Sequence, residues 1–182
     1  VTESNHDITL LLGVNCEDYY NSCFGLIENP RTEDVDDLVG AHGWESVSSL
    51  FYILNNTIEY IVLRNWESLP NDLLHDTHKD VDMLVSNLTD ASYILNAKFP
   101  EEHRVHYHVM IENEPVPFDL RYVGDNYYDI KFEQDMLDTR VKNTGGFYTP
   151  NINNHFYSLL YHAYIHKNGF KDKYKIRLSD LT

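Results

Sequence analysis

The feature that most constrains the fold is a helical stripe followed by two short apolar runs. Residues 44–56, WESVSSLFYILNN, place apolar side chains at the i, i+3, i+4 and i+7 spacing of an amphipathic helix, namely Val47, Leu50, Phe51 and Leu54. The runs 58–63 (IEYIVL) and 81–85 (VDMLV) are typical of short strands buried on both faces. An amphipathic helix beside buried strands favours an architecture in which helices cover a sheet.

The second half of the chain extends this pattern. Residues 103–111 and 116–123 predict a hairpin with ENEP as its turn. Asn87 and Asp90 can cap a helix before that hairpin. Two more helices are expected, over residues 128–141 and 153–167. We therefore predict an α+β (mixed α/β) fold, a small mixed sheet flanked by helices.

Length and charge limit the kind of protein. The 182 residues suit one domain, and an apolar content of 42% argues against a disordered chain. We assign residues 46–182 to that domain and residues 1–45 to an N-terminal extension packed on it. The net charge of −15 disfavours long nucleic acid as a partner, because phosphate binding needs clustered Lys and Arg. The first and last residues raise the expectation of a fragment whose longer chain supplies further domains.

The number of cysteines and the hydropathy of the chain indicate the cellular compartment. Cys16 and Cys23 are too few for a disulfide framework and lack a second pair for zinc, so we expect free thiols, with one disulfide as the alternative. No apolar stretch approaches the ~18 to 20 residues that span a bilayer, and the N-terminus lacks a signal pattern. The sequence therefore predicts a cytoplasmic protein without a membrane span.

Three carboxylates suggest a site. Asp80 and Asp82 stand two residues apart at the start of an expected strand and so project from the same face. Such a pair favours Mg²⁺ or Mn²⁺, because a bound cation relieves the repulsion between the two charges. Asp119 lies within the later strand VPFDLRYV, and it can join the same ion if the two strands are neighbours. The alternatives are a solvated Asp80–Asp82 pair at an exposed edge, and an Asp119 paired with Arg121.

These motifs resemble the nucleotidyltransferase superfamily. The helix, the strand IEYIVL, the segment K-DVD-MLV and the later PFDLR follow the order of its core, which carries an Asp-x-Asp/Glu pair and a third acidic residue on a later strand. The resemblance covers roughly residues 46–165. The chain is similar in particular to divergent bacterial and viral members of the superfamily linked to surface-polysaccharide assembly, and more distantly to LicD and fukutin-like phosphosugar transferases.

The resemblance implies a set of roles. Asp80, Asp82 and Asp119 would be the catalytic and metal-binding carboxylates. Mg²⁺ ions would hold a nucleoside triphosphate and help to activate an acceptor hydroxyl. The partners would be a nucleotide or nucleotide sugar and a small hydroxyl-bearing acceptor, with polysaccharide biosynthesis as the setting.

One departure from the family pattern follows the first strand. The family usually has a Gly-Gly or Gly-Ser pair there, whereas this chain has Arg64 and Asn65 in LRNWESLP. Arg64 can bind phosphate through its guanidinium, and Asn65 or Ser68 can add hydrogen bonds. The bulky pair fits a changed donor or a lost activity equally well.

Further polar side chains complete the candidate set. Lys79 and Arg121 are candidates for substrate contact, although a solvated loop position is the alternative for Lys79. His155, His162 and His166 share one stripe of the last expected helix, where the latter two can reach one metal ion, contact an anionic substrate or simply pack. Gly145-Gly146 is expected to end the preceding helix rather than to bind phosphate.

Three functions are compatible with these features. The first is a Mg²⁺-dependent transferase that moves a nucleotidyl or phosphosugar group. The second is a GT-A glycosyltransferase, in which the DxD pair holds Mn²⁺ and a nucleotide sugar. The third is a non-catalytic module that binds a nucleotide, a glycan or a neighbouring domain. The first requires Asp119 beside Asp80 and Asp82, whereas the second does not.

Overall fold

A computed structural model of the chain describes residues 40, 42–75, 79–98, 105–167 and 170–181. Both cysteines and residues 1–39 of the predicted extension lie outside these ranges. The helices are α3 (Val47–Thr57), η2 (Leu73–His75, 3-10), α4 (Leu88–Ile94), α5 (Ile130–Asp138), α6 (Ile152–Tyr161), η3 (His162–His166, π) and α7 (Asp172–Asp180). The strands are β1 (Tyr60–Arg64), β2 (Val81–Val85), β3 (His106–Ile111), β4 (Glu114–Tyr122), β5 (Val141–Lys142) and β6 (Tyr148–Thr149).

A mixed four-stranded sheet forms the centre of the fold. Its strand order is β1-β2-β4-β3, with β2 parallel to β4 and the other neighbouring pairs antiparallel. The strands β5 and β6 pair with each other in a separate small sheet. Helices cover the four-stranded sheet, so the predicted α+β class is confirmed.

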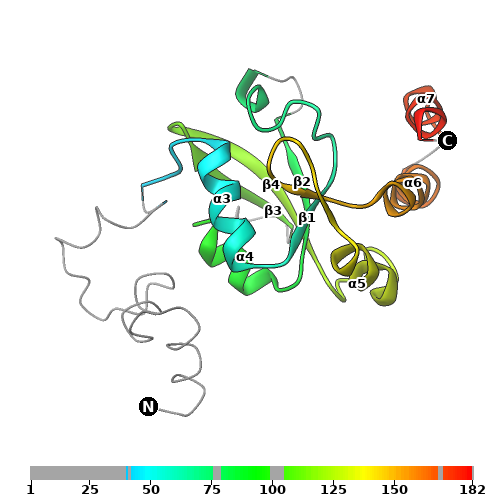
Figure 1. The fold of residues 1–182 in the computed structure, drawn as a ribbon, viewed down its shortest axis with the longest axis horizontal. Coiled ribbons are helices and arrows are strands. Elements are labelled where there is room, and N and C mark those ends of the chain that lie inside the picture. The colour runs from blue at the N-terminus through cyan, green and yellow to red at the C-terminus, as the bar shows by residue number, and fades with distance from the viewer. Residues whose placement is uncertain (1–39, 41, 76–78, 99–104, 168–169, 182) are drawn as a thin grey trace, which may run out of the picture.

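Two hydrophobic layers hold the helices on opposite faces of the sheet. The helices α3 and α4 pack on one face, while α5 packs on the other with α6 beside it (Figure 1). Along β2, Met83 faces the α3 layer and Leu84 faces the α5 layer. Because side chains alternate along a strand, Asp82 belongs to the α5 side. The alternation therefore decides which face carries the carboxylate.

Local sequence signals account for the helix starts. Ser46 caps α3 by accepting a hydrogen bond from the backbone N–H of Ser49, and the predicted apolar stripe is buried. Asn87 caps α4 by accepting from the N–H of Asp90, as its sequence predicted. These two predicted helices are confirmed.

Other predicted boundaries are wrong. The strand β4 begins at Glu114, so only part of ENEP forms the turn. The helix α5 ends at Asp138, and Gly145-Gly146 lies between β5 and β6 instead of ending a helix. There the side chain of Asn143 accepts from the N–H of Gly145 at 2.8 Å, which closes a turn whose Gly146 has φ of +86°.

The C-terminal part also differs from the prediction. The single helix expected over residues 153–167 is α6 followed by the π-helical turn η3. No helix was predicted where α7 lies, and the buried side chains of α7 are only Tyr174 and Leu178. Within the described ranges, none of the helices has the length and apolar character needed to cross a bilayer.

Candidate functional site

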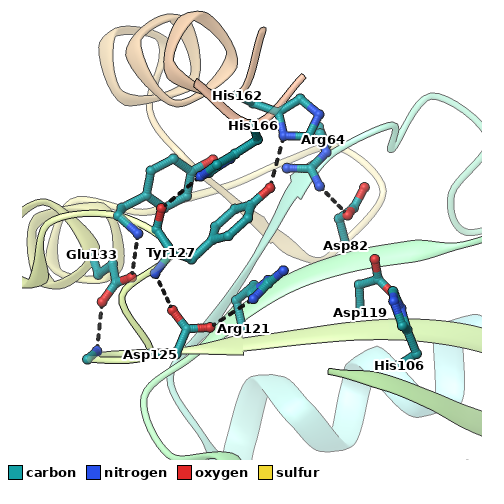
Figure 2. Close-up of polar contacts among 12 residues, drawn as sticks. Arg64, Asp82, His106, Asp119, Arg121, Asp125, Tyr127, Glu133, His162 and His166 are labelled. Carbon is teal, nitrogen blue, oxygen red and sulfur yellow. Dashed lines mark hydrogen bonds and ion pairs between the residues drawn. The ribbon is translucent and has the colours of Figure 1, made fainter. Parts of the chain in front are cut away.

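Asp82 and Asp119 lie directly opposite each other on the neighbouring parallel strands β2 and β4. Figure 2 shows both side chains on the same side of the sheet, close to Arg64. Asp82 is 3% exposed as a residue, while the side chain of Asp119 is 24% exposed. The adjacency that the three-carboxylate hypothesis required is therefore present in the fold.

Asp82 is held by the two residues that follow the core of β1. Arg64 Nη2 donates to Asp82 Oδ1 at 2.5 Å, and Asn65 Nδ2 donates to Asp82 Oδ2 at 3.3 Å. Burial raises the pKa of Asp82 to about 6 against the attraction of Arg64, and the charges of Asp119 and Asp80 act in the same direction as burial. Asp82 thus carries a charge that its protein partners balance only in part.

Asp119 and Arg121 have separate partners. Asp119 forms a close contact with Nδ1 of His106, from the neighbouring strand β3. Arg121 Nη1 lies 3.5 Å from Oδ2 of Asp125, whose side chain is 4% exposed. The alternative in which Asp119 pairs with Arg121 is therefore wrong, because each finds a different partner.

The other predicted site residues, Asp80, Ser68 and Lys79, have different environments. Asp80 precedes β2 rather than lying within it, yet its charge still acts on Asp82. Ser68 has a buried hydroxyl for which the described part of the chain supplies no hydrogen-bond partner. Lys79 Nζ lies 3.3 Å from Oε2 of Glu114 in an exposed pair, which fits the surface alternative for this lysine.

Tyr127 is a site residue that sequence reasoning missed. The guanidinium of Arg121 lies 3.9 Å from the centre of its ring, and its hydroxyl is 2.9 Å from Nδ1 of His162. His166 stacks on the same ring with centroids 3.9 Å apart and contacts the Tyr127 carbonyl through Nε2 at 3.1 Å. Figure 2 shows Tyr127 with Arg121 on one side and with His162 and Arg64 on the other. The sequence held no signal beyond one tyrosine among fourteen.

A buried acid positions the loop that carries Tyr127. Glu133 accepts from the backbone N–H of Gly124 at 2.7 Å and from that of Tyr128 at 3.1 Å. Burial raises the pKa of Glu133, while the two backbone donors oppose that rise. Asp125 accepts from the N–H of Tyr127 at 2.8 Å, so two carboxylates fix this loop.

The three histidines of the predicted stripe divide between two environments. His155 packs against Trp66 with ring centroids 4.4 Å apart, whereas the rings of His162 and His166 are 5.7 Å apart at the site. Burial lowers the pKa of His162 to about 3, helped by nearby cations that include Arg64. His162 is therefore neutral at physiological pH and is a weak base.

The C-terminal helix reaches the site through one arginine. Arg177 Nη1 donates to Oδ1 of Asn65 at 2.7 Å, and Arg177 Nη2 lies 2.9 Å from Oε1 of Glu67. Asn65 has φ of +58°, in the left-handed region that Asn tolerates better than most side chains. Arg177, Asn65 and Asp82 therefore form a continuous polar chain from α7 to β2.

A metal ion could bind these carboxylates only after the side chains around Asp82 rearrange. In the described ranges, no three or more His, Cys, Asp and Glu side chains are grouped so that they could hold a metal. The donor set does fit Mg²⁺ or Mn²⁺, because carboxylate oxygens are the ligands these ions prefer. The incompletely balanced charge of Asp82 would also favour a cation. Such an ion would replace Arg64 on Asp82.

An aromatic cavity lies beside the end of the loop that carries Tyr127. Its volume is about 650 Å³, and its wall includes Tyr128, which follows Tyr127 in the chain. The other lining residues are Asp129, Phe132, Asn154, Tyr157, Leu160, Tyr161 and Tyr164. Asp82 and Asp119 do not line it, so this cavity and the carboxylate site are separate features.

No family model matches this chain, and neither does a curated protein sequence or a solved structure. The resemblance to nucleotidyltransferases therefore stays a prediction that rests on the motifs. The geometry contributes one independent fact to it, the pairing of Asp82 with Asp119.

Proposed function

We infer that the chain is a Mg²⁺-dependent transferase that moves a nucleotidyl or phosphosugar group to a small hydroxyl-bearing acceptor. The observation that carries this proposal is the position of Asp82 opposite Asp119 on parallel strands. Asp80 lies near enough for its charge to act on Asp82, so it would supply a third carboxylate after the rearrangement that metal binding requires. A bound Mg²⁺ would neutralise phosphate charge and fix the reacting groups in place.

Arg64 has two uses in this proposal. Without an ion it balances part of the charge of Asp82, and with an ion on the carboxylates its guanidinium can turn to a phosphate oxygen. Arg121 offers a second guanidinium on the same face of the sheet, held over Tyr127. Asn65 and Ser68 would add hydrogen bonds to the substrate. Glycan synthesis is the setting that the motif resemblance suggests.

The same contacts favour a second candidate. Arg64 and Asn65 together occupy both oxygens of Asp82, so the site is partly charge-balanced without any ion. A non-catalytic module that binds an anionic ligand would need no more than this arrangement. The two candidates differ in whether binding depends on a divalent cation.

Calorimetry separates these functions. Mg²⁺ and Mn²⁺ would be titrated alone and with a panel of nucleoside triphosphates and nucleotide sugars. We expect metal-dependent nucleotide binding that is lost in Asp82→Asn and weakened in Asp119→Asn, with the exposed Asp180→Asn as the matched control. Binding without any metal dependence would favour the non-catalytic module. Selective binding of a nucleoside-diphosphate sugar with Mn²⁺, unaffected by Asp119→Asn, would favour a GT-A glycosyltransferase.

A further inference from the structure

One ionisable side chain from each strand of the four-stranded sheet stands in a single row across it. The row consists of Arg64 (β1), Asp82 (β2), Asp119 (β4) and His106 (β3), and each residue is the register partner of the next. Register partners on neighbouring strands point to the same face, so two acids lie between two bases (Figure 2). Asp82 contacts Arg64, and Asp119 contacts His106. Each acid of the row is therefore engaged by the base on its outer side.

A β-bulge places Arg64 in this row. The register of β1 against β2 shifts between Val62 and Arg64, so that Leu63 is passed over and Arg64 lies opposite Asp82. Leu63 packs in the α5 layer, and strict alternation would turn the next side chain to the opposite face. Bulges commonly re-aim a side chain in this way. The irregular backbone thus brings a guanidinium to the buried carboxylate.

The two bases differ in how easily they can leave their acids. The side chain of His106 is 48% exposed, whereas that of Arg64 is 13% exposed. A displaced His106 can turn to water. A displaced Arg64 would keep its charge, because a guanidinium does not lose its proton at physiological pH. After Asp82, the groups that act most strongly on Arg64 are the phenols of Tyr127 and Tyr128, which are neutral. Arg64 would then be a largely buried cation without a counterion, which is costly.

We propose that Arg64 makes the binding of a divalent cation between Asp82 and Asp119 conditional on a phosphate-bearing ligand. This inference rests on the proposed function, because it concerns the same metal site. A cation on Asp82 displaces the guanidinium, and a phosphate can then take the place of the carboxylate, since a guanidinium fork matches phosphate geometry. The phosphate removes the cost of an unpaired Arg64, and the cation keeps Asp82 from competing with the phosphate. Cation and phosphate therefore bind cooperatively.

The test measures Mn²⁺ binding to the full chain by electron paramagnetic resonance of the free ion, with and without inorganic phosphate. A titration without protein accounts for the Mn²⁺ that phosphate itself binds. We expect phosphate to raise the Mn²⁺ affinity of the wild type about tenfold or more, within the range typical of coupled sites. Mn²⁺ should raise the affinity for phosphate by the same factor, because such coupling is reciprocal. Acetate at equal ionic strength should not change the Mn²⁺ affinity.

Arg64→Gln removes the group that is proposed to couple the two ligands. This variant should bind Mn²⁺ without phosphate at least as tightly as the wild type does with phosphate, and phosphate should no longer raise its affinity. Arg64→Lys keeps a cation beside Asp82 without the bidentate fork, so its coupling should be present but weaker, and it serves if Arg64→Gln does not fold. Arg140→Gln is the matched control, because Arg140 forms an ion pair outside the row, 3.3 Å from Glu59. It should keep the coupling of the wild type. Circular dichroism establishes that each variant is folded.

The outcomes separate this inference from the proposed function. Equal Mn²⁺ affinity of the wild type with and without phosphate would overturn the inference and leave the proposed function standing. Coupling that persists unchanged in Arg64→Gln would also overturn it, because another group would then connect the two ligands. An effect of acetate equal to that of phosphate would overturn the assignment of a phosphate-bearing ligand. Absence of Mn²⁺ binding in every variant and condition would overturn the proposed function together with the inference.

Discussion

Asp82 and Arg64 form a hydrogen-bonded ion pair between β2 and the end of β1, and its N···O distance is 2.5 Å. The side chains are 4% and 13% exposed, so water screens this pair little. Burial nevertheless outweighs the attraction and raises the pKa of Asp82 to about 6. Arg64 therefore stabilises the negative charge of Asp82 only in part, and either a proton or a divalent cation can neutralise that charge.

Asp82→Asn should change how stability depends on pH. The pKa of Asp82 rises from 3.8 to about 6 on folding, so the native state binds its proton more tightly than the unfolded state. This group's contribution to stability is complete below about pH 4 and is lost as the pH rises through about 6, by about 3 kcal/mol. The free energy of unfolding of Asp82→Asn relative to wild type should therefore increase from pH 4 to 6.5 and then level off, as measured by urea denaturation. A difference that is constant with pH would contradict the raised pKa, and Asp180→Asn serves as the control.

Arg64→Gln should destabilise the protein more at pH 8 than at pH 5. At pH 8 the substitution leaves a buried carboxylate without its cation, at a loss of about 3 kcal/mol. At pH 5 Asp82 is largely protonated in the native state, so the loss is smaller. Combining it with Asp82→Asn should restore most of the stability at pH 8. If the loss were equal at both pH values and the double variant did not recover, Arg64 would contribute through packing alone.

Tyr127→Phe should remove the hydroxyl contact with His162 and keep the ring under Arg121. The expected loss of stability is about 1 kcal/mol for one partly buried hydrogen bond. Because His162 has a pKa of about 3, it is neutral at pH 6 and at pH 8, and the loss should be the same at both. Thermal denaturation measures it. Tyr157→Phe is the control, since Tyr157 is 59% exposed and its change should have little effect.

Glu133→Gln should loosen the loop that carries Tyr127. The carboxylate accepts from two backbone N–H groups, and an amide replaces one acceptor oxygen by a donor that faces an N–H. We expect a loss of about 1 to 3 kcal/mol and faster hydrogen exchange at the amides of Gly124 and Tyr128. The exposed Glu45→Gln is the matched control. Unchanged exchange at these two amides would show that Glu133 does not hold the loop.

The sequence predicted the layered part of the fold well. The stripe from Val47 to Leu54 encodes a buried face locally through a period of about 3.6 residues, and the continuous apolar run in β1 encodes a strand buried on both faces. The π-helical turn η3 and the helix α7 were missed, because their conformations depend on packing against distant segments. The buried face of α7, for example, consists of Tyr174 and Leu178 and exists only against α6.

The candidate site, like the fold, was predicted from the sequence only in part. The sequence by itself determined that Asp82 lies at the start of a buried strand, directly after Asp80, and that Asp119 lies in another strand, because short apolar runs identify strands without any knowledge of their neighbours. Only the tertiary structure decided that β2 and β4 are parallel neighbours in the register that sets Asp82 opposite Asp119. It also brought Tyr127, His162 and Arg177 to the same centre. Strand pairing and side-chain contacts between distant segments depend on the packing of the whole chain, which no local pattern records.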